Sequence, residues 1–535
     1  QIGVDPSEPM LLSVLVLAVV FVGLLWVIRR PRAYSVLLDS CFNMIQRNES
    51  TRRLEPLNDP IFPFGNISQW VHNPGDMLKR ASKNYEEYGW YYSWTLFTQT
   101  VSVGKVEYIK QMCSQNFTIR SSTRDLHVRF PVWTMLFGEG LFMVGSDKWK
   151  RMHKIAIRGM GSNKLRFYLP AVLECSDRVI SHLQDSAKEA EKKNKSEFLV
   201  DTEELFRNYA TEAIMSIGFG QSLAYNEISR LGKKFVNVME KGSTPIYMVN
   251  AYIFSPLPGP TSLRRDIGEL HSTCRQIVRE YRHAKKKEPS TEPQAIGCLL
   301  QALCDASDGD DMFTEEECVH NVYSFIGAGI DTTSTALTHC ALLLSLYPEI
   351  QDKIRTELKE DEGKFDISKA LTGYPYLSAF IKETLRLYPP IIGLPIRKTT
   401  TKTKLGQLTL RSGACVSCNS LAVGRAKTVW GEDASVFRPS RFLETSEGRT
   451  RDKKGIDITN SMGSKFVTFG AGVRTCIGKN LSVMEVKSVL SKLLRNFEII
   501  NLHKDKLNKG RKHWKMNAVF CRVKPEFARL AFRPI

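Results

Sequence analysis

The stretch FGAGVRTCIG, residues 469–478, places a single cysteine among three glycines and an arginine. Glycines keep side chains from crowding the backbone, so a large group can approach the chain closely there. Arg474 adds a fixed positive charge two residues before the sulfur of Cys476. The pattern predicts a loop that binds something large and anionic.

Two chemistries compete for this loop. A dinucleotide-binding loop has the form G-x-G-x-x-G; Gly470 and Gly472 fit, but the last position is Thr475, which argues against a nicotinamide site. A thiolate ligand to a metal cofactor fits better, because a neighbouring cation and a helix starting near Ile477 both stabilise a thiolate. Haem offers a planar face to the sulfur and two propionates to an arginine.

The loop resembles the F-x-x-G-x-R-x-C-x-G signature of the cytochrome P-450 family, the haem-thiolate monooxygenases. The matching residues are Phe469, Gly472, Arg474, Cys476 and Gly478. The resemblance covers roughly residues 60 to 535. It implies a haem b whose iron is ligated by Cys476, with Phe469 near the sulfur and Arg474 on a propionate.

Two further motifs match the family's structural triad. ETLR puts Glu383 and Arg386 three residues apart on one helix face, and FRPSRF, residues 437–442, supplies Arg441. From the residues alone this is only an ion pair. The resemblance implies that the three side chains hold the haem loop in place.

The stretch AGIDTTS, residues 328–334, lies inside a predicted helix over 314–347 that opens with a capping box from Thr314 to Glu317. A carboxylate and a hydroxyl in an apolar helix cost free energy unless they are partnered. A capped kink is one interpretation. The resemblance implies another, in which Asp331 and Thr332 are an acid–alcohol pair that delivers protons to bound O2.

Two other residues match propionate-binding positions of the family. Trp149 begins a W-x-x-x-R motif, but the fourth following residue here is His153, so Lys154 or Arg151 is the expected substitute for the missing arginine. Arg397 stands where the family often has another propionate-binding arginine.

The N-terminal region carries a membrane signal. Met10 to Ile28 are 19 residues without a charge, close to the length of a spanning helix. Arg29, Arg30 and Arg32 follow, so the positive-inside rule puts the catalytic part in the cytosol. We expect a single-pass endoplasmic reticulum protein with a luminal 1–9, an anchor at 10–28, a tether at 29–59 and a monooxygenase domain at 60–535.

Periodicity predicts a mainly α fold with small β-sheets. Long helices are expected over 162–190, 200–220 and 314–347, and short strands over 395–424. Residues 284–313 are charged and turn-rich, which is typical of a surface loop. The last fifteen residues resemble a hairpin.

Charge and cysteine content indicate the kind of partner and the redox compartment of the protein. The chain has 75 Lys and Arg against 56 Asp and Glu, a net charge of +19, which favours an acidic partner. No zinc finger or recognition helix accompanies these charges, so nucleic acid is excluded. The 12 cysteines are scattered, which fits a reducing compartment. The CxxC pair Cys415 and Cys418 lies in a strand-like segment and is interpreted as structural.

Four apolar segments are the expected substrate walls: 130–142, 243–258, Phe325 to Thr332 and Ile391 to Ile396. They predict an apolar substrate that enters from the membrane side. Two framework stretches, 422–442 and 465–490, resemble the fatty-acid and alkane ω-hydroxylase branch. A fatty acid or similar lipid is therefore expected, with a terpenoid or polyketide as the alternative.

The chain has no flavin or dinucleotide loop, so its electrons must come from a partner. The resemblance implies an acidic NADPH-dependent flavoprotein reductase, and Lys479 and Lys487 are expected to help dock it. A haem-thiolate isomerase or dehydratase needs no such electrons, but Asp331 and Thr332 argue against it. A non-catalytic haem binder is the remaining alternative, and NADPH consumption would exclude it.

Overall fold

The structure is a computed structural model, and it describes most of the chain after residue 73. The described residues are 45–46, 74–95, 98–113, 117–118, 131–248, 250–287, 298–305, 313–361, 363, 365–393, 395–444, 465–502, 514–516 and 519–535. The predicted anchor at 10–28 and most of the tether lie outside them. Within these ranges, no helix has the length and apolar character needed to cross a membrane.

Helices make up most of the described chain. The longer ones are α4 (Pro74–Glu87), α8 (Ser146–Met160), α9 (Leu165–Lys192), α10 (Thr202–Phe219), α11 (Tyr225–Gly242), α13 (Pro258–Lys287), α15 (Glu315–Leu346), α16 (Pro348–Lys359), α18 (Pro375–Leu387) and α22 (Lys479–Asn496). The shorter ones are α5 (Val106–Met112), α7 (Pro131–Phe137), α12 (Asn250–Ile253), α14 (Cys298–Cys304), α17 (Ile367–Leu371), α19 (Ser420–Val423), α20 (Lys427–Trp430), α21 (Arg441–Glu444) and α24 (Pro525–Ala528). Single 3₁₀ turns are η2 (Ser162–Lys164), η3 (Pro245–Met248) and η6 (Gly472–Arg474).

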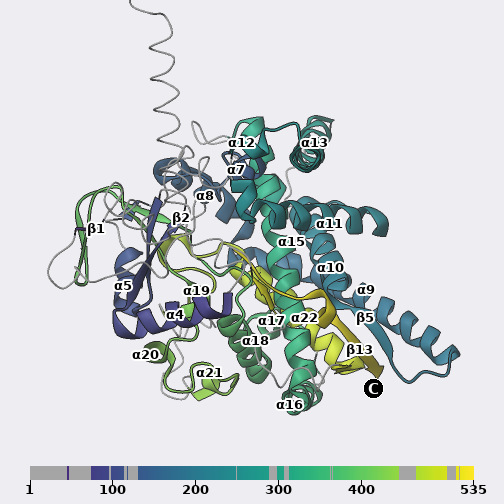
Figure 1. Ribbon diagram of the computed structural model, residues 1–535. Helices are drawn as coiled ribbons and strands as arrows, with labels where there is room; N and C mark the ends of the chain where they lie inside the picture. Colours follow the sequence, from purple (N-terminus) through teal and green to yellow (C-terminus); the bar gives the residue numbers. More distant parts are fainter. Residues whose placement is uncertain are drawn as a thin grey trace, which may run out of the picture.

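The three long predicted helices are confirmed as α9, α10 and α15. α15 begins as its capping box predicts: Thr314 Oγ1 accepts from the Glu317 N–H, and Glu317 Oε2 accepts from the Thr314 N–H, both at 3.1 Å. Its side chains are apolar around most of its circumference, which is the pattern of a helix buried on all sides. Figure 1 accordingly shows α15 passing through the middle of the helical region, beside α10 and α11.

The strands are short and form small sheets. The largest sheet has the order β2 (Trp90–Thr95), β3 (Thr98–Val103), β9 (Cys415–Ser417), β6 (Arg397–Thr399) and β4 (Phe117–Thr118). A second has β10 (Phe497–Ile500), β13 (Arg529–Pro534) and β5 (Phe198–Asp201), and a third has β1 (Ile45–Gln46), β8 (Leu408–Leu410) and β7 (Thr403–Leu405). β11 (Trp514–Met516) pairs with β12 (Cys521–Val523). The strands predicted over 395–424 are confirmed as β6 to β9.

The predicted C-terminal hairpin is wrong. β12 pairs with β11, whereas β13 pairs with β10 and β5 in another sheet. The cause is Pro525, which opens the short helix α24 between the two strands and redirects the chain. Strand-like alternation on both sides of a proline therefore did not mean that the two strands pair with each other.

The CxxC segment changes from strand to helix within a few residues. Cys415 lies in β9 and Cys418 follows it, and both side chains are buried in the core. Asn419 Oδ1 then accepts from the Ala422 N–H at 3.0 Å and caps α19. The two cysteines are packed side chains, as the structural interpretation predicts.

Glu485 is a buried acid between α22 and α15, and it makes stability depend on pH. Thr333 Oγ1 donates to Glu485 Oε2 at 3.2 Å, and burial raises the pKa of Glu485 from 4.5 to about 8. Between these two values only the unfolded chain releases the proton, so folded-state stability is lost as the pH rises through this window. At pH 8 the raised pKa of Glu485 lowers the free energy of unfolding by roughly 3–5 kcal/mol.

We therefore expect Glu485→Gln to raise the thermal midpoint at pH 8 and to lose this advantage as the pH falls toward 5. The glutamine oxygen still accepts from Thr333 but carries no proton to release. Differential scanning calorimetry at both pH values checks this. Glu526→Gln, at an exposed position, is the control and should change neither midpoint. A Glu485→Gln midpoint below that of wild type at pH 8 would contradict the argument.

Candidate functional site

The cysteine loop lies between Phe466 and the start of α22, and its glycines are required by the backbone. Gly470 and Gly472 have φ of +81° and +70°, which side chains with a Cβ rarely adopt. A Cβ on Gly472 would also lie 3.0 Å from Cys113 Cβ. The Cys476 N–H donates to the Phe469 carbonyl at 2.8 Å and closes the loop. Phe469 itself is half-buried.

The sulfur of Cys476 sits at the start of α22. The backbone N–H groups of Gly478 and Lys479 donate to it and, with the charge of Lys479, favour the thiolate. Burial acts in the opposite direction and raises the pKa of the thiol overall. The prediction that Arg474 stabilises this thiolate is wrong, because its guanidinium is directed to Trp149 and Val144 instead.

Cys476 is accessible to solvent although protein surrounds its sulfur. Its side chain is exposed to solvent, yet the surrounding protein desolvates the thiol strongly enough to raise its pKa. The two facts agree if the sulfur lines an enclosed space. A Cβ on Gly478 would lie 4.0 Å from Cys476 Sγ, so this glycine leaves room beside the sulfur.

α15 also has one open face. It is buried along most of its length, but Ala328 is exposed and Gly329 and Thr332 are partly exposed. Positions i, i+1 and i+4 share one side of a helix, so these three residues mark a single opening. Thr332 Oγ1 donates to the Ala328 carbonyl at 2.7 Å within that face.

Asp331 points elsewhere, because adjacent helix residues are about 100° apart. Its side chain is buried, and Oδ1 lies 2.6 Å from Nη2 of Arg522 in β12. Oδ2 is buried as well and has no hydrogen-bond partner in the described structure. Burial raises the pKa of Asp331, while Arg522 opposes the shift. α15 continues without interruption from Glu315 to Leu346, and the partner of Asp331 is the side chain of Arg522.

The structure brings Trp149, His153 and Arg474 together. The guanidinium carbon of Arg474 lies 4.0 Å from the centre of the Trp149 ring, and its Nη2 donates to the Val144 carbonyl at 3.0 Å. The His153 ring is 4.6 Å from that of Trp149. Burial, and then the charge of Arg474, lower the pKa of His153, so the imidazole is biased toward its neutral form.

The two proposed substitutes for the missing arginine lie on α8 as well. Arg151 forms an ion pair with Glu317 at the start of α15, and Lys154 is exposed on α8. Arg397 reaches the loop from β6: it is buried, and its two terminal nitrogens donate to the carbonyls of Met112 and Ala471, both at 3.1 Å. The position expected to hold arginine is therefore filled by His153 itself.

Glu383 and Arg386 form a fully buried bidentate ion pair, with N–O distances of 2.6 and 2.7 Å. Arg386 also donates to backbone carbonyls of the segment before α21, at Ala434 (2.5 Å) and Val436 (3.2 Å). Arg441 Nε lies 3.6 Å from Glu383 Oε1. The three predicted triad residues therefore meet in the core.

The sequence reasoning missed a fourth member, Asp433. Its Oδ1 lies 2.8 Å from Arg441 and its Oδ2 2.8 Å from Arg438. These arginines, Arg441 first, lower the pKa of Asp433 to about 2. Its acidic character beside FRPSRF was the available signal, since two nearby arginines need a counter-charge.

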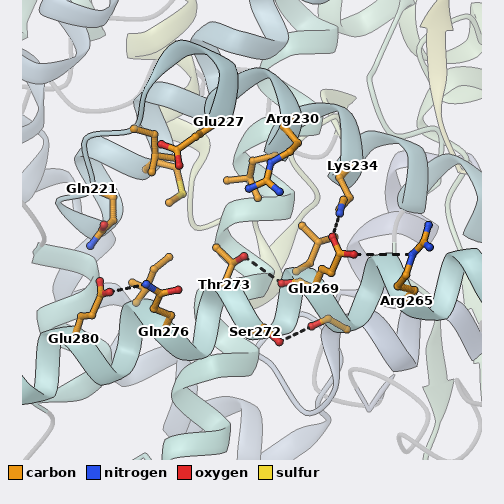
Figure 2. A pocket seen from close by; sticks show the side chains of 16 residues that line it. Gln221, Glu227, Arg230, Lys234, Arg265, Glu269, Ser272, Thr273, Gln276 and Glu280 are labelled. Atoms are coloured by element: carbon orange, nitrogen blue, oxygen red, sulfur yellow. Dashed lines mark hydrogen bonds and ion pairs between the residues drawn. The ribbon is translucent and has the colours of Figure 1, made fainter.

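A separate groove of about 720 Å³ lies between α11 and α13 (Figure 2). Figure 2 shows charged side chains of both signs around it, including Glu227, Arg230 and the ion-paired Lys234 and Glu269. Neither Cys476 nor Thr332 lines it. The groove is therefore distinct from the site that the sequence predicts.

A sequence model of the cytochrome P450 family matches residues 56–524, and the chain belongs to this family. It is thus a haem-thiolate monooxygenase. Similar proteins include cytochrome P450 709B3 of Arabidopsis thaliana, 26% identical over 83% of this chain and 80% of that protein. Cytochrome P450 734A1 of the same plant is 28% identical over 69% and 68%. Cytochrome P450 72A552 of Barbarea vulgaris is 26% identical over 85% and 83%. These names state no substrate, so the comparisons leave the ω-hydroxylase branch as a hypothesis.

Proposed function

We propose that Cys476 ligates the haem iron and that the enzyme hydroxylates an apolar substrate held between this loop and the open face of α15. The observation that carries the proposal is an accessible sulfur that receives two backbone N–H groups in a glycine-rich loop. Bound haem supplies the iron at which O2 is reduced by two electrons, one oxygen entering the substrate and the other leaving as water. The domain that performs this reaction is proposed to span 60–535.

The residues around the loop suit a large dianionic macrocycle. Arg474 and Arg397 supply two cations next to the loop, and Trp149 and His153 supply polar ring N–H groups beside Arg474. We assign these four residues to the haem propionates. Gly478 keeps the backbone beside the Cys476 sulfur free of a side chain.

Thr332 and Asp331 have separate parts in proton delivery. Thr332 presents its hydroxyl at the open face of α15, where it can hold a proton for bound oxygen. Asp331 lies behind it, held by the ion pair with Arg522, and its second carboxylate oxygen, which has no hydrogen-bond partner in the described structure, can accept and release a proton. This division explains why a buried acid and a half-exposed alcohol stand next to each other.

We expect Thr332→Val to lower the yield of product per NADPH consumed by about 100-fold, the lower end of the contribution typical of a positioned proton donor. Valine has the same shape but no hydroxyl, so O2 reduction continues without oxygen transfer. Parallel measurements of NADPH, O2 and product check this.

Thr338→Val is the matched control for that experiment. Thr338 also donates to the carbonyl four residues earlier, Ser334, at 2.9 Å, but it is buried and away from the open face. Equal product yields for the two variants would count against a role for Thr332.

The segments predicted as substrate walls differ in burial. Within 131–142, Trp133 and Phe137 are buried, and the Trp133 ring packs on those of Phe137 and Phe520, with ring centres 5.8 and 6.0 Å apart. Ile391 and Ile396, the two ends of another predicted wall, are half-buried. Apolar residues at these places support an apolar substrate. A fatty acid or similar long-chain lipid is the proposed class, and a terpenoid or polyketide is the alternative.

Titration of the ferric haem spectrum separates these two substrate classes. A ligand that enters the site expels water from the iron and changes its spin state. A saturable change with long-chain fatty acids alone supports the proposed class. A change with cyclic terpenoids alone rejects it in favour of the alternative.

The enzyme needs an electron-donating partner, as members of the family do, and we propose an NADPH-dependent flavoprotein reductase.

The prediction that Lys487 helps to dock this reductase is wrong. Lys487 is buried, and its Nζ donates to the Gly373 carbonyl at 2.7 Å, because it caps the end of α17. Lys154 and Arg158 are exposed cations on α8, the helix whose Trp149 contacts Arg474 of the cysteine loop. A hydrogen bond of 2.8 Å from Asn480 Nδ2 in α22 to Ser162 Oγ in η2, just after α8, joins the two regions.

We also propose that the protein lies on the endoplasmic reticulum membrane. The expected anchor lies outside the described residues, so support comes from the surface near α12. Ile246, Phe254 and Leu257 are 44%, 59% and 50% exposed there. Three exposed apolar side chains within one short segment suit contact with lipid.

A further inference from the structure

Two cysteines from different helices meet where α14 ends and α15 begins. Cys304 is the last residue of α14, and Cys318 lies in the first turn of α15. Cys318 Sγ donates at 3.3 Å to the carbonyl of Leu303, the residue before Cys304, and the Cys304 thiol lies close enough to affect the pKa of Cys318. The two sulfurs are therefore adjacent although 13 residues separate them in the sequence.

An arginine completes the pair. Arg282 of α13 places Nη2 3.5 Å from Cys318 Sγ. The hydrogen bond from Cys304 and the charge of Arg282 lower the pKa of Cys318 against the opposing effects of burial and Glu317. The same hydrogen bond raises the pKa of Cys304. Arg282 thus places a positive charge beside the Cys318 sulfur, where a thiolate would form.

The pair can be reached from solvent on one side. Cys318 is buried, whereas Cys304 is half-buried at the end of α14. Other cysteines differ in this respect: Cys274 and Cys340 are buried, and burial raises the pKa of each. A thiolate supported by an arginine, next to a second thiol, is the arrangement that reacts with oxidants.

We propose that Cys304 and Cys318 are a thiol pair that hydrogen peroxide converts into a disulfide joining α14 to α15. The Cys318 thiolate attacks one peroxide oxygen, the O–O bond breaks, and the hydroxide that leaves takes a proton to become water. The Cys304 sulfur then attacks the Cys318 sulfenic acid, the S–O bond breaks, and a second water leaves. The two sulfurs lose two electrons and the peroxide gains them.

The disulfide would act on the helix that carries Asp331 and Thr332. It closes the segment 304–318 and restricts the unfolded chain, which stabilises the fold. The oxidised protein should therefore melt at a higher temperature than the reduced one. This inference does not depend on the role proposed for Cys476.

The first experiment maps the oxidised cysteines. The full-length haem-loaded protein is reduced, desalted and treated with stepwise additions of hydrogen peroxide; catalase stops the reaction, free thiols are alkylated, and peptides are analysed by mass spectrometry. The expected result is a Cys304–Cys318 disulfide that accumulates before any Cys415–Cys418 disulfide. Alkylation of both Cys304 and Cys318 while other cysteines are oxidised would overturn the proposal.

Variants test the roles within the pair. Arg282→Gln should slow disulfide formation by about tenfold, whereas Arg282→Lys, which keeps the charge, should retain most of the rate. In Cys304→Ser, Cys318 should accumulate as a sulfenic acid that dimedone traps. Equal rates for the glutamine and lysine variants would remove Arg282 from the proposal.

Thermal melting tests the consequence. Oxidation should raise the midpoint of the wild-type protein and leave that of Cys304→Ser unchanged, while Cys340→Ser should respond like wild type. Identical midpoints for oxidised and reduced wild type would show that no disulfide joins α14 to α15 and would overturn the proposal.

Discussion

Replacing Cys476 with serine is expected to reduce product formation at least about 100-fold and to abolish the thiolate signature in the spectrum of the ferrous carbonyl complex. A serine hydroxyl stays protonated near neutral pH and donates little electron density to iron, whereas a thiolate favours O–O cleavage. The two N–H groups at the start of α22 are aimed at an anionic sulfur and would have no such acceptor. Absorption spectra and product assays with a reductase measure both effects.

Cys175→Ser provides the control for this prediction. Cys175 is a buried cysteine in α9 that contacts Arg178 and lies outside the loop. It should keep both the spectrum and the activity. If Cys476→Ser retained the thiolate signature while circular dichroism showed a native fold, another residue would have to be the ligand, and the proposed function would lose its main support.

The second large effect is expected from Glu383→Gln, which should destabilise the fold by about 3–5 kcal/mol and lower haem retention. The substitution leaves the guanidinium of Arg386, which is 1% exposed, without its counter-charge. It also removes the negative charge that lies between Arg386 and Arg441, so the two guanidinium groups repel each other. Because these arginines hold the segment from Gly424 to Val436, the effect should spread to the neighbouring haem loop.

An exposed pair of the same spacing separates burial from charge in this test. Asp185 and Lys188 lie 3.1 Å apart with exposures of 74% and 71%, and Asp185→Asn should cost less than about 1 kcal/mol. Thermal midpoints and haem content are measured for Glu383→Gln and Asp185→Asn. Similar losses in the two variants would mean that burial of the Glu383 pair adds nothing.

The local signals in the sequence predicted the local structure well. The capping box at Thr314 and Glu317 placed the start of α15, because these contacts join residues three apart. The cysteine motif likewise placed Cys476 at the start of a helix. Periodicity succeeded for the long helices because each repeats its apolar face over many turns. It failed at Pro525, where two strand-like segments belong to different sheets.

Side-chain partners far apart in the sequence could not be predicted. Lys487 was expected on the surface, because lysines are almost always exposed, yet three carbonyls around Gly373 hold it in the core. Arg522 gave no sign that it would meet Asp331, 191 residues earlier. Such pairs form only after helices and sheets have packed.

The sequence by itself therefore determined the class of protein, the cysteine loop, the long helices and the identity of the triad residues. Each of these depends on residues that are close along the chain or on a motif long enough to be specific. Only the tertiary structure decided which face of α15 is open, that Asp331 is turned toward Arg522, and that Cys304 meets Cys318 beside Arg282. The physical reason is that burial, charge pairing and thiol contact depend on which distant surfaces come together, and no local pattern of residues encodes that.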